Sequence, residues 1–298
     1  DTDTDTIREW RDADDTALTI ALQDPGGPAM VTVSESVVAR AVRYVGRQRP
    51  RHAVRDWLAA LTWDDEPRLD TWLETHLGAV VSDDQPRSYL RAVARTLLLG
   101  AVARVQQPGC QLDTMVVLEG PQGAGKSRAL RVLGGAWYAL MSESADSKDF
   151  AQALAGKWIV EMGELDALSR SRQERIKIAI STPIDRYRPS YGRTAQDYPR
   201  QCVLVGTTNR SDYGHDDTGL RRFLTNRIGR INIDALTRDR TQLFAEAVAR
   251  LPTTSYWEIP SAETRAVQAD RQADDVWAPL VWDWIARQPD EPLTLHAI

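Results

Sequence analysis

The chain has 298 residues, of which 42% are hydrophobic and 27% are charged, a composition typical of globular proteins in water. No apolar run approaches the length of a transmembrane helix, so we expect no membrane partner. The net charge of −5 argues against a surface that coats nucleic acid, and any nucleic-acid contact must therefore be local. Two cysteines, Cys110 and Cys202, are too few for a disulfide framework, which favours a cytoplasmic location. A start without methionine suggests a piece of a longer protein.

The first third of the chain is expected to be mainly helical. Residues 1–33 are acidic and then rich in turn formers, and residues 24–28 would interrupt any helix. From Ser34 onward, apolar residues recur at helical spacing. The same pattern repeats over residues 54–61, 69–77 and 89–105. We therefore predict an N-terminal region, residues 1–107, in which an acidic tail precedes a set of helices.

After residue 107 the pattern changes to short β-branched runs that alternate with helical segments. The runs expected to be strands cover residues 115–118, 158–160 and 202–205. Continuous apolar strands separated by helices indicate a parallel sheet covered on both faces. The predicted fold class is therefore α/β, with a core over residues 108–235. Residues 236–298 are expected to form a small C-terminal helical lobe in which Trp277, Trp282 and Trp284 pack.

A segment that begins at residue 120 matches the phosphate-binding pattern Gly-x-x-x-x-Gly-Lys-[Ser/Thr] at every fixed position. It consists of Gly120, Pro121, Gln122, Gly123, Ala124, Gly125, Lys126 and Ser127. An expected strand runs directly into the segment and a helical pattern follows it, which is the context that phosphate binding requires. Lys126 would reach the β and γ phosphates of ATP, and Ser127 would bind Mg²⁺. The alternative to a nucleotide site is a glycine-rich turn that fits the pattern by chance.

Two glutamates follow the second expected strand. Glu161 and Glu164 lie at its carboxyl end, and we expect this strand to neighbour the strand over residues 115–118. Phosphoryl transfer needs one acid near the metal and another that orients water. We assign Glu161 to the Mg²⁺ shell and Glu164 to water activation, and the opposite assignment stays open. Surface acids that happen to follow a strand are the alternative.

Polar and basic residues follow the third expected strand. Asn209 ends it, and its amide can both donate and accept, which suits contact with the attacking water or the γ-phosphate. Arg221 and Arg222, further along the chain, suit an arginine finger that stabilises charge on the phosphoryl group in the transition state. Such a finger enters the site of a neighbouring subunit, so the pair predicts a homo-oligomeric ring. Either arginine could instead form a structural salt bridge.

Arginines and tyrosines are interleaved between the acids and the third expected strand. The cluster consists of Arg186, Tyr187, Arg188, Tyr191 and Arg193. Arginines supply phosphate contacts and tyrosines supply stacking faces, so this segment is expected to contact single-stranded DNA from a loop or hairpin. The alternative is structural cation–π packing.

Taken together, these motifs resemble the virulence-associated protein E family of phage and genomic-island ATPases. The resemblance covers roughly residues 55–235 and rests, in chain order, on residues 118–127, Trp137, residues 158–165, 187–188 with 191–193, 206–209 and 219–223. The family implies an AAA+ core of the superfamily 3 helicase type, in which a hairpin ahead of the third strand touches single-stranded DNA inside a hexamer. It also implies a primase-polymerase module in cis or in trans.

Two classes of function fit these expectations. The first is an ATP-driven DNA helicase or replication motor of a phage or mobile element, with a 3′-to-5′ polarity implied by the resemblance. The second is a nucleotide-switched assembly or regulatory ATPase, including an antiviral or interference role, without unwinding activity. Loss of DNA-stimulated turnover on mutation of Arg188 and Arg193 would favour the first.

Overall fold

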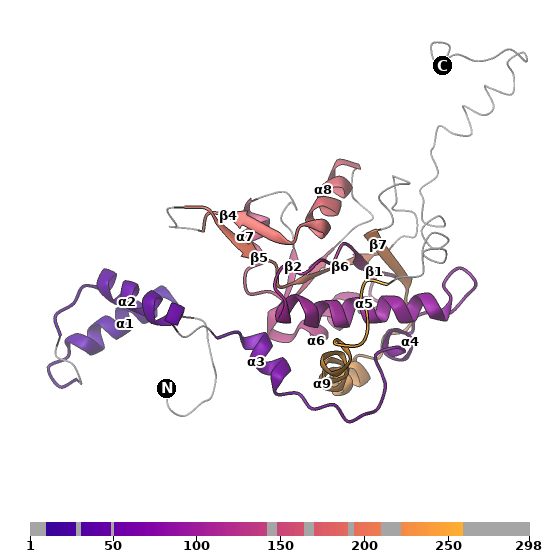
Figure 1. Cartoon of the computed structure of the whole chain (residues 1–298), viewed down its shortest axis with the longest axis horizontal. Helices are drawn as coiled ribbons and strands as arrows, with labels where there is room; N and C mark the ends of the chain where they lie inside the picture. The colour runs from indigo at the N-terminus through magenta and orange to yellow at the C-terminus, as the bar shows by residue number, and fades with distance from the viewer. Residues whose placement is uncertain are drawn as a thin grey trace, which may run out of the picture. The chain divides into compact units, whose positions relative to one another are not determined.

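The computed structural model describes residues 10–27, 31–48, 51–141, 148–163, 170–189, 194–209 and 222–258. The chain divides into two compact units, Asp1–Ala53 and Val54–Ile298, which we consider separately. Figure 1 labels the helices and strands in chain order. None of the described helices is long and apolar enough to cross a membrane.

The first unit contains the helices α1 (Asp12–Gln23) and α2 (Glu35–Gln48), which pack against each other. The sequence pattern did not reveal α1, because its acidic start was taken for a tail. Three of these acids, Asp12, Asp14 and Asp15, lie in the first turn of α1, where carboxylates interact favourably with the helix dipole. The helix ends before the turn-forming segment that was expected to interrupt it.

The second unit is built on a five-stranded sheet in the order β2-β3-β6-β1-β7, and every neighbouring pair in it is parallel. Its strands are β1 (Met115–Glu119), β2 (Tyr138–Met141), β3 (Ile159–Met162), β6 (Val203–Thr208) and β7 (Phe223–Arg227). Helices flank the sheet, so the predicted α/β class with a parallel sheet is confirmed. One expectation is wrong: β3 does not neighbour β1, because β6 lies between them.

Helices on the two faces of the sheet form two hydrophobic cores. The described helices of this unit are α3 (Ala53–Ala59), α4 (Trp72–Leu77), α5 (Arg87–Gln106), α6 (Lys126–Gly134), α7 (Lys148–Ala153), α8 (Arg170–Ser181) and α9 (Ile233–Arg250), with a short 3-10 turn, η1 (Gly135–Trp137), after α6. Alternate residues of a strand point to opposite faces. Val116 and Leu118 therefore join the core formed with α5, α6 and α9. Met115 and Val117 join the smaller core formed with α7 and α8.

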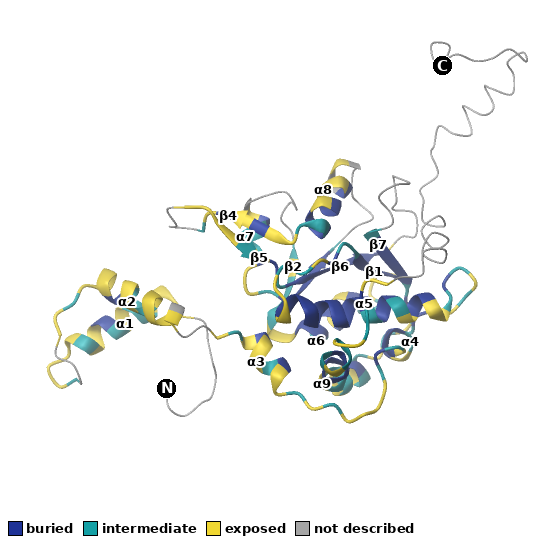
Figure 2. Ribbon diagram, viewed as in Figure 1, coloured by how far each residue is buried: buried dark blue, intermediate teal, exposed yellow. Residues whose placement is uncertain are grey.

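An aromatic cluster connects the helices that precede the sheet to α9. The Trp57 ring of α3 lies 5.9 Å from the ring of Trp158 and 5.6 Å from that of Phe244, measured between ring centroids. Trp158 is fully buried, and its indole Nε1 donates to the backbone oxygen of Ala101 in α5 at 2.8 Å. Figure 2 shows α5 as a largely buried helix of this unit. Residues 54–107 thus share one core with the sheet.

The predicted domain boundaries at residues 107 and 235 stay predictions. The predicted C-terminal lobe begins within α9, whose Leu243 and Ala247 are buried in the core. The tryptophans assigned to this lobe, Trp277, Trp282 and Trp284, lie outside the described residues.

An antiparallel hairpin, β4 (Ile184–Tyr187) and β5 (Gln196–Pro199), is inserted between α8 and β6 (Figure 1). The sequence predicted a loop or hairpin at this place. Arg200 is buried at its base, and its Nε and Nη2 donate to the two carboxylate oxygens of Asp185 at 2.9 and 2.5 Å. Its Nη1 donates to the backbone oxygen of Ala179 in α8. The bidentate pair therefore fixes the hairpin on α8.

Loss of the Arg200 guanidinium is expected to destabilise the protein. In Arg200→Ala the carboxylate of Asp185 stays buried without its partner, which typically costs about 3–5 kcal/mol. The matched control is Arg186→Ala, which breaks an ion pair with Asp197 in the same hairpin. Both of those side chains are more than half exposed, and such pairs contribute at most about 1 kcal/mol. Urea unfolding followed by tryptophan fluorescence measures the free energy of unfolding of both variants, and equal decreases in it would contradict this account.

Candidate functional site

The glycine-rich loop, residues 120–127, connects β1 to α6 and curls at two glycines. Gly123 and Gly125 have φ angles of +80° and +95°, a region in which side chains are strained. Helix α6 begins at Lys126, so the backbone N–H groups of its first turn, which have no carbonyl partner within the helix, and the positive end of its dipole face the loop. The predicted order of strand, loop and helix is therefore present, and the loop has the geometry of an anion site.

Oxygen atoms surround the ammonium of Lys126. Its Nζ donates to the backbone oxygens of Gly120 at 2.5 Å and Pro121 at 3.0 Å, and to the Oδ1 of Asn209 at 2.9 Å. Asn209 directly follows β6, which lies beside β1 in the sheet. These three acceptors are uncharged, and an anionic phosphate oxygen would be a stronger acceptor than any of them.

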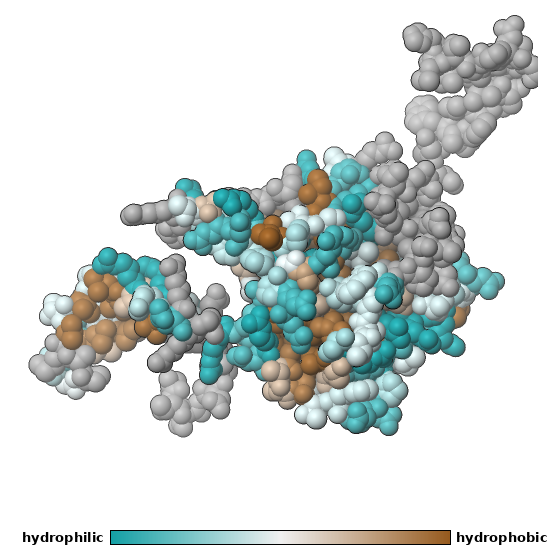
Figure 3. Space-filling view, in the orientation of Figure 1, coloured by the Kyte–Doolittle hydropathy of each residue, from teal (hydrophilic) through white to brown (hydrophobic). Residues whose placement is uncertain are grey.

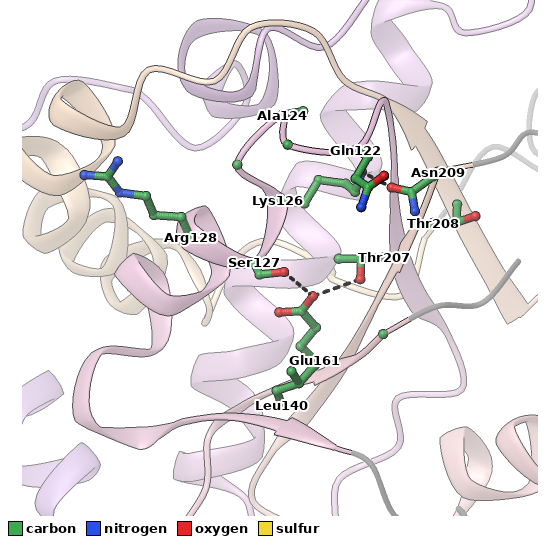
Figure 4. Close-up of a pocket in the computed structure, with 13 residues that line it drawn as sticks. Gln122, Ala124, Lys126, Ser127, Arg128, Leu140, Glu161, Thr207, Thr208 and Asn209 are labelled. Carbon is green, nitrogen blue, oxygen red and sulfur yellow. Dashed lines mark hydrogen bonds between the residues drawn. The ribbon is translucent and has the colours of Figure 1, made fainter. Parts of the chain in front are cut away.

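The carboxylate of Glu161, on β3, is the centre of a second cluster (Figure 4). Glu161 is 1% exposed. Its Oε1 accepts hydrogen bonds from Ser127 Oγ at 2.7 Å and from Thr207 Oγ1 at 2.8 Å. Its Oε2 accepts a hydrogen bond from the hydroxyl of Tyr138 at 2.6 Å. The two predicted metal ligands, Ser127 and Glu161, are therefore in direct contact.

Both clusters line one open cleft of about 360 Å³ at the carboxyl ends of β1, β3 and β6. The residues that line it are Gln122, Gly123, Ala124, Gly125, Lys126, Ser127, Arg128, Leu140, Glu161, Gly163, Thr207, Thr208 and Asn209. The described residues contain no group of three or more His, Cys, Asp or Glu side chains that could hold a metal. A Mg²⁺ ion beside Ser127 and Glu161 would need further oxygen ligands from a phosphate or from water. The donor set therefore fits a metal that arrives with a phosphorylated substrate.

Tyr138 and Thr207 are residues of this site that sequence reasoning missed. Burial, followed by the hydrogen bond to Glu161, raises the pKa of the Tyr138 phenol, so this group remains a donor. No pattern pointed to Tyr138, because β2 is a short edge strand with little apolar periodicity. Thr207 stands in the polar run that ends β6, just before Asn209, and this run was the one available signal for it.

The other residues predicted for catalysis are only partly described. Glu164 and Arg221 lie outside the described residues. Arg222 precedes β7, and its Nε donates to the Oγ of Ser181 in α8 at 3.0 Å. Together with Lys177 it lines a separate open groove rather than the cleft.

Three of the predicted DNA-contacting residues, Arg186, Tyr187 and Arg188, lie in β4 or directly after it. Arg186 and Arg188 are exposed, and Figure 3 shows mainly hydrophilic side chains over β4 and β5. Tyr187, by contrast, is 9% exposed, and its ring stacks on that of Tyr198 with centroids 4.3 Å apart. The Tyr187 ring is thus engaged in packing within the hairpin, whereas the two arginines face solvent. Tyr191 and Arg193 lie outside the described residues.

A family model described as the virulence-associated protein E-like domain matches residues 58–276, well over half of the chain. The chain belongs to the virulence-associated protein E-like family. This membership confirms the resemblance that the motifs indicated, and the match extends past residue 235, where the resemblance was expected to end. No curated protein sequence matches this family member.

Solved structures of the C-terminal region of NrS-1 are similar to this virulence-associated protein E-like chain. An apo structure of that region aligns with a TM-score of 0.50 at 15% identity and covers 76% of this chain. A second apo structure, called the A form, aligns with a TM-score of 0.48 at 14% identity and covers the same share. The chain spans only about half of the region it matches, 56% and 55% in the two structures. At this identity the first alignment supports the α/β fold alone.

Removal of the Thr207 hydroxyl is expected to destabilise the protein through Glu161. In Thr207→Val the buried carboxylate loses one of the three hydroxyl donors that the described residues give it, at nearly constant side-chain volume. Hydrogen bonds to charged groups contribute about 1.5–3 kcal/mol. Thr237→Val is the control, because the Thr237 hydroxyl donates to the backbone oxygen of Ile233 on an exposed part of α9. That change should cost about 0.5 kcal/mol or less. Urea unfolding measures the free energy of unfolding of both variants. If Thr207→Val lowers it no more than Thr237→Val does, the importance of this cluster is contradicted.

Proposed function

We propose that this chain binds ATP with Mg²⁺ in the cleft and hydrolyses it. The observation that carries the proposal is the convergence of Lys126, Ser127, Glu161 and Asn209 at one edge of the sheet. This edge is formed by the carboxyl ends of parallel strands, where open α/β sheets commonly bind ligands. The start of α6 adds backbone N–H groups for phosphate oxygens.

Each of these residues would have a separate role. Lys126 would exchange the two loop carbonyls for oxygens of the β and γ phosphates. Ser127 would bind Mg²⁺ through a lone pair of its hydroxyl oxygen while the hydroxyl hydrogen keeps its hydrogen bond to Glu161. Bound Mg²⁺ would neutralise and align the phosphate oxygens. Asn209, already beside Lys126, would orient the attacking water or the γ-phosphate.

Two further roles fall to residues predicted from the sequence. Glu164 would activate the water if Glu161 holds the metal. Arg221 or Arg222 would act as the finger for a neighbouring subunit. In support of an action between subunits, Arg222 does not line the cleft of its own chain.

We infer that hydrolysis drives a replication motor of a phage or mobile element, a superfamily 3-like helicase acting as a homo-oligomeric ring, of hexameric type, on single-stranded DNA. Membership of the virulence-associated protein E-like family supports the replication context. The exposed Arg186 and Arg188 on the hairpin support a local contact with phosphates on a chain that is acidic overall. A primase-polymerase module in cis or in trans is the expected partner.

Steady-state ATP hydrolysis with and without single-stranded DNA tests this function. We expect Mg²⁺-dependent turnover that DNA stimulates, and we expect Lys126→Ala to reduce it to background because the phosphates lose their cation. The assay is run at protein concentrations where mass measurement shows a ring. Turnover that ignores DNA under those conditions would contradict the motor and favour a nucleotide-switched assembly or regulatory ATPase.

Arg188→Ala tests the hairpin within the same assay. The variant should keep its turnover without DNA but need higher DNA concentrations for stimulation, and its DNA affinity should fall less steeply with added salt because one phosphate contact is lost. The control is Arg238→Ala, which removes a similarly exposed arginine from α9, far along the chain from the hairpin. Equal behaviour of the two variants would contradict a DNA contact at the hairpin.

A further inference from the structure

The two oxygens of the Glu161 carboxylate are held from different sides. Ser127 and Thr207 share Oε1, at 2.7 and 2.8 Å. Among the described residues, the hydroxyl of Tyr138 is the donor to Oε2, at 2.6 Å. Rotation of the carboxylate is therefore restrained by a donor on each oxygen, and Tyr138 supplies the restraint on Oε2, to which neither Ser127 nor Thr207 donates.

Helix α6, which carries Lys126 and Ser127, also packs against Tyr138. Gly134, the last residue of α6, lies so close that a Cβ there would be 2.8 Å from the Cβ of Tyr138. Near the same end of α6, the guanidinium carbon of Arg131 lies 5.5 Å from the centroid of the Tyr138 ring. A glycine and a cation of α6 thus determine where the phenol of β2 can lie. Helix α6 therefore acts on Glu161 in two ways: Ser127 donates to it directly, and Gly134 and Arg131 contact Tyr138, which donates to its other oxygen.

We propose that Tyr138 is a positioning residue that fixes the Glu161 carboxylate in the orientation that Mg²⁺-nucleotide binding needs. The inference rests on the proposed function and adds a residue to it. The Ser127 hydroxyl can donate its hydrogen bond to Oε1 while a lone pair of its oxygen faces a metal. This arrangement requires that Oε1 keeps its position. Without the bond at Oε2 the carboxylate is free to turn about its terminal torsion, which is broad in glutamate. Partners that orient metal-binding groups commonly change metal affinity or activity by about 10–100-fold when removed.

A purely structural role for Tyr138 predicts a different result. In that case loss of the hydroxyl lowers the stability of the protein but leaves the dependence on Mg²⁺ unchanged. The deciding readout is therefore the free Mg²⁺ concentration at half-maximal binding of a fluorescent ATP analogue, measured beside the thermal unfolding midpoint without nucleotide.

The experiment compares Tyr138→Phe with Tyr89→Phe in the full chain. Each change removes one phenolic oxygen, and the Tyr89 hydroxyl donates to the backbone oxygen of Thr225 at 2.9 Å instead of to Glu161. We expect Tyr138→Phe to raise the half-maximal Mg²⁺ concentration about ten-fold or more. We expect Tyr89→Phe to leave that concentration at the wild-type value, whatever its effect on the unfolding midpoint.

The possible outcomes distinguish failure of this inference from failure of the proposed function on which it rests. If the wild type binds the analogue with Mg²⁺ and Tyr138→Phe has the same half-maximal Mg²⁺ concentration, the inference is overturned and the proposed function stands. If the wild type binds no nucleotide with Mg²⁺, the proposed function fails and the inference fails with it. If Tyr138→Phe does not fold in buffer, both proteins are measured in trimethylamine N-oxide, an osmolyte that favours the folded state. An unshifted half-maximal Mg²⁺ concentration in the folded Tyr138→Phe protein would then overturn the inference.

Discussion

A carboxylate that is removed from water needs hydrogen-bond donors, and this need connects the parts of the site around Glu161. Among the described residues, its hydroxyl donors come from separate elements: Ser127 from α6, Thr207 from β6 and Tyr138 from β2. The site is complete only when the strands stand in the order found in the sheet. Because β6 lies between β1 and β3, Thr207 reaches Glu161 on one side while Asn209 reaches Lys126 on the other. The carboxylate and the glycine-rich loop are thus coupled through β6.

The hydrophobic cores explain why this edge of the sheet is stable enough to hold charged groups. The central strands β1 and β3 are buried along their whole length, and alternate residues pack against helices on opposite faces. Near their carboxyl ends these strands carry polar side chains, Glu161 on β3 and Thr207 and Thr208 on β6. Loops at such an edge are positioned by a rigid sheet, which is the usual arrangement for binding sites in α/β proteins. The ammonium, the hydroxyls and the carboxylate are therefore held before any ligand arrives.

Sequence reasoning located the elements whose signal is local and missed those that depend on tertiary contacts. The three apolar runs and the glycine-rich loop were visible because buried strands and a phosphate motif have distinctive compositions. Strand β7 mixes apolar with polar residues, including Asn226, so no strand was predicted there although it is buried beside β1. The insertion of β6 between β1 and β3 leaves no trace in composition. Tyr138 could not be found for the same reason, because its partner lies on another strand.

The most direct test of this account is a crystal structure with a non-hydrolysable ATP analogue and Mg²⁺. The account predicts a γ-phosphate oxygen about 3 Å from the Nζ of Lys126, in place of at least one loop carbonyl. It also predicts Mg²⁺ about 2.1 Å from the Oγ of Ser127, with Glu161 still held by Tyr138 and Thr207. A nucleotide bound elsewhere, or a site in which Lys126 keeps its bonds to Gly120 and Pro121 at saturating analogue, would contradict the central claim.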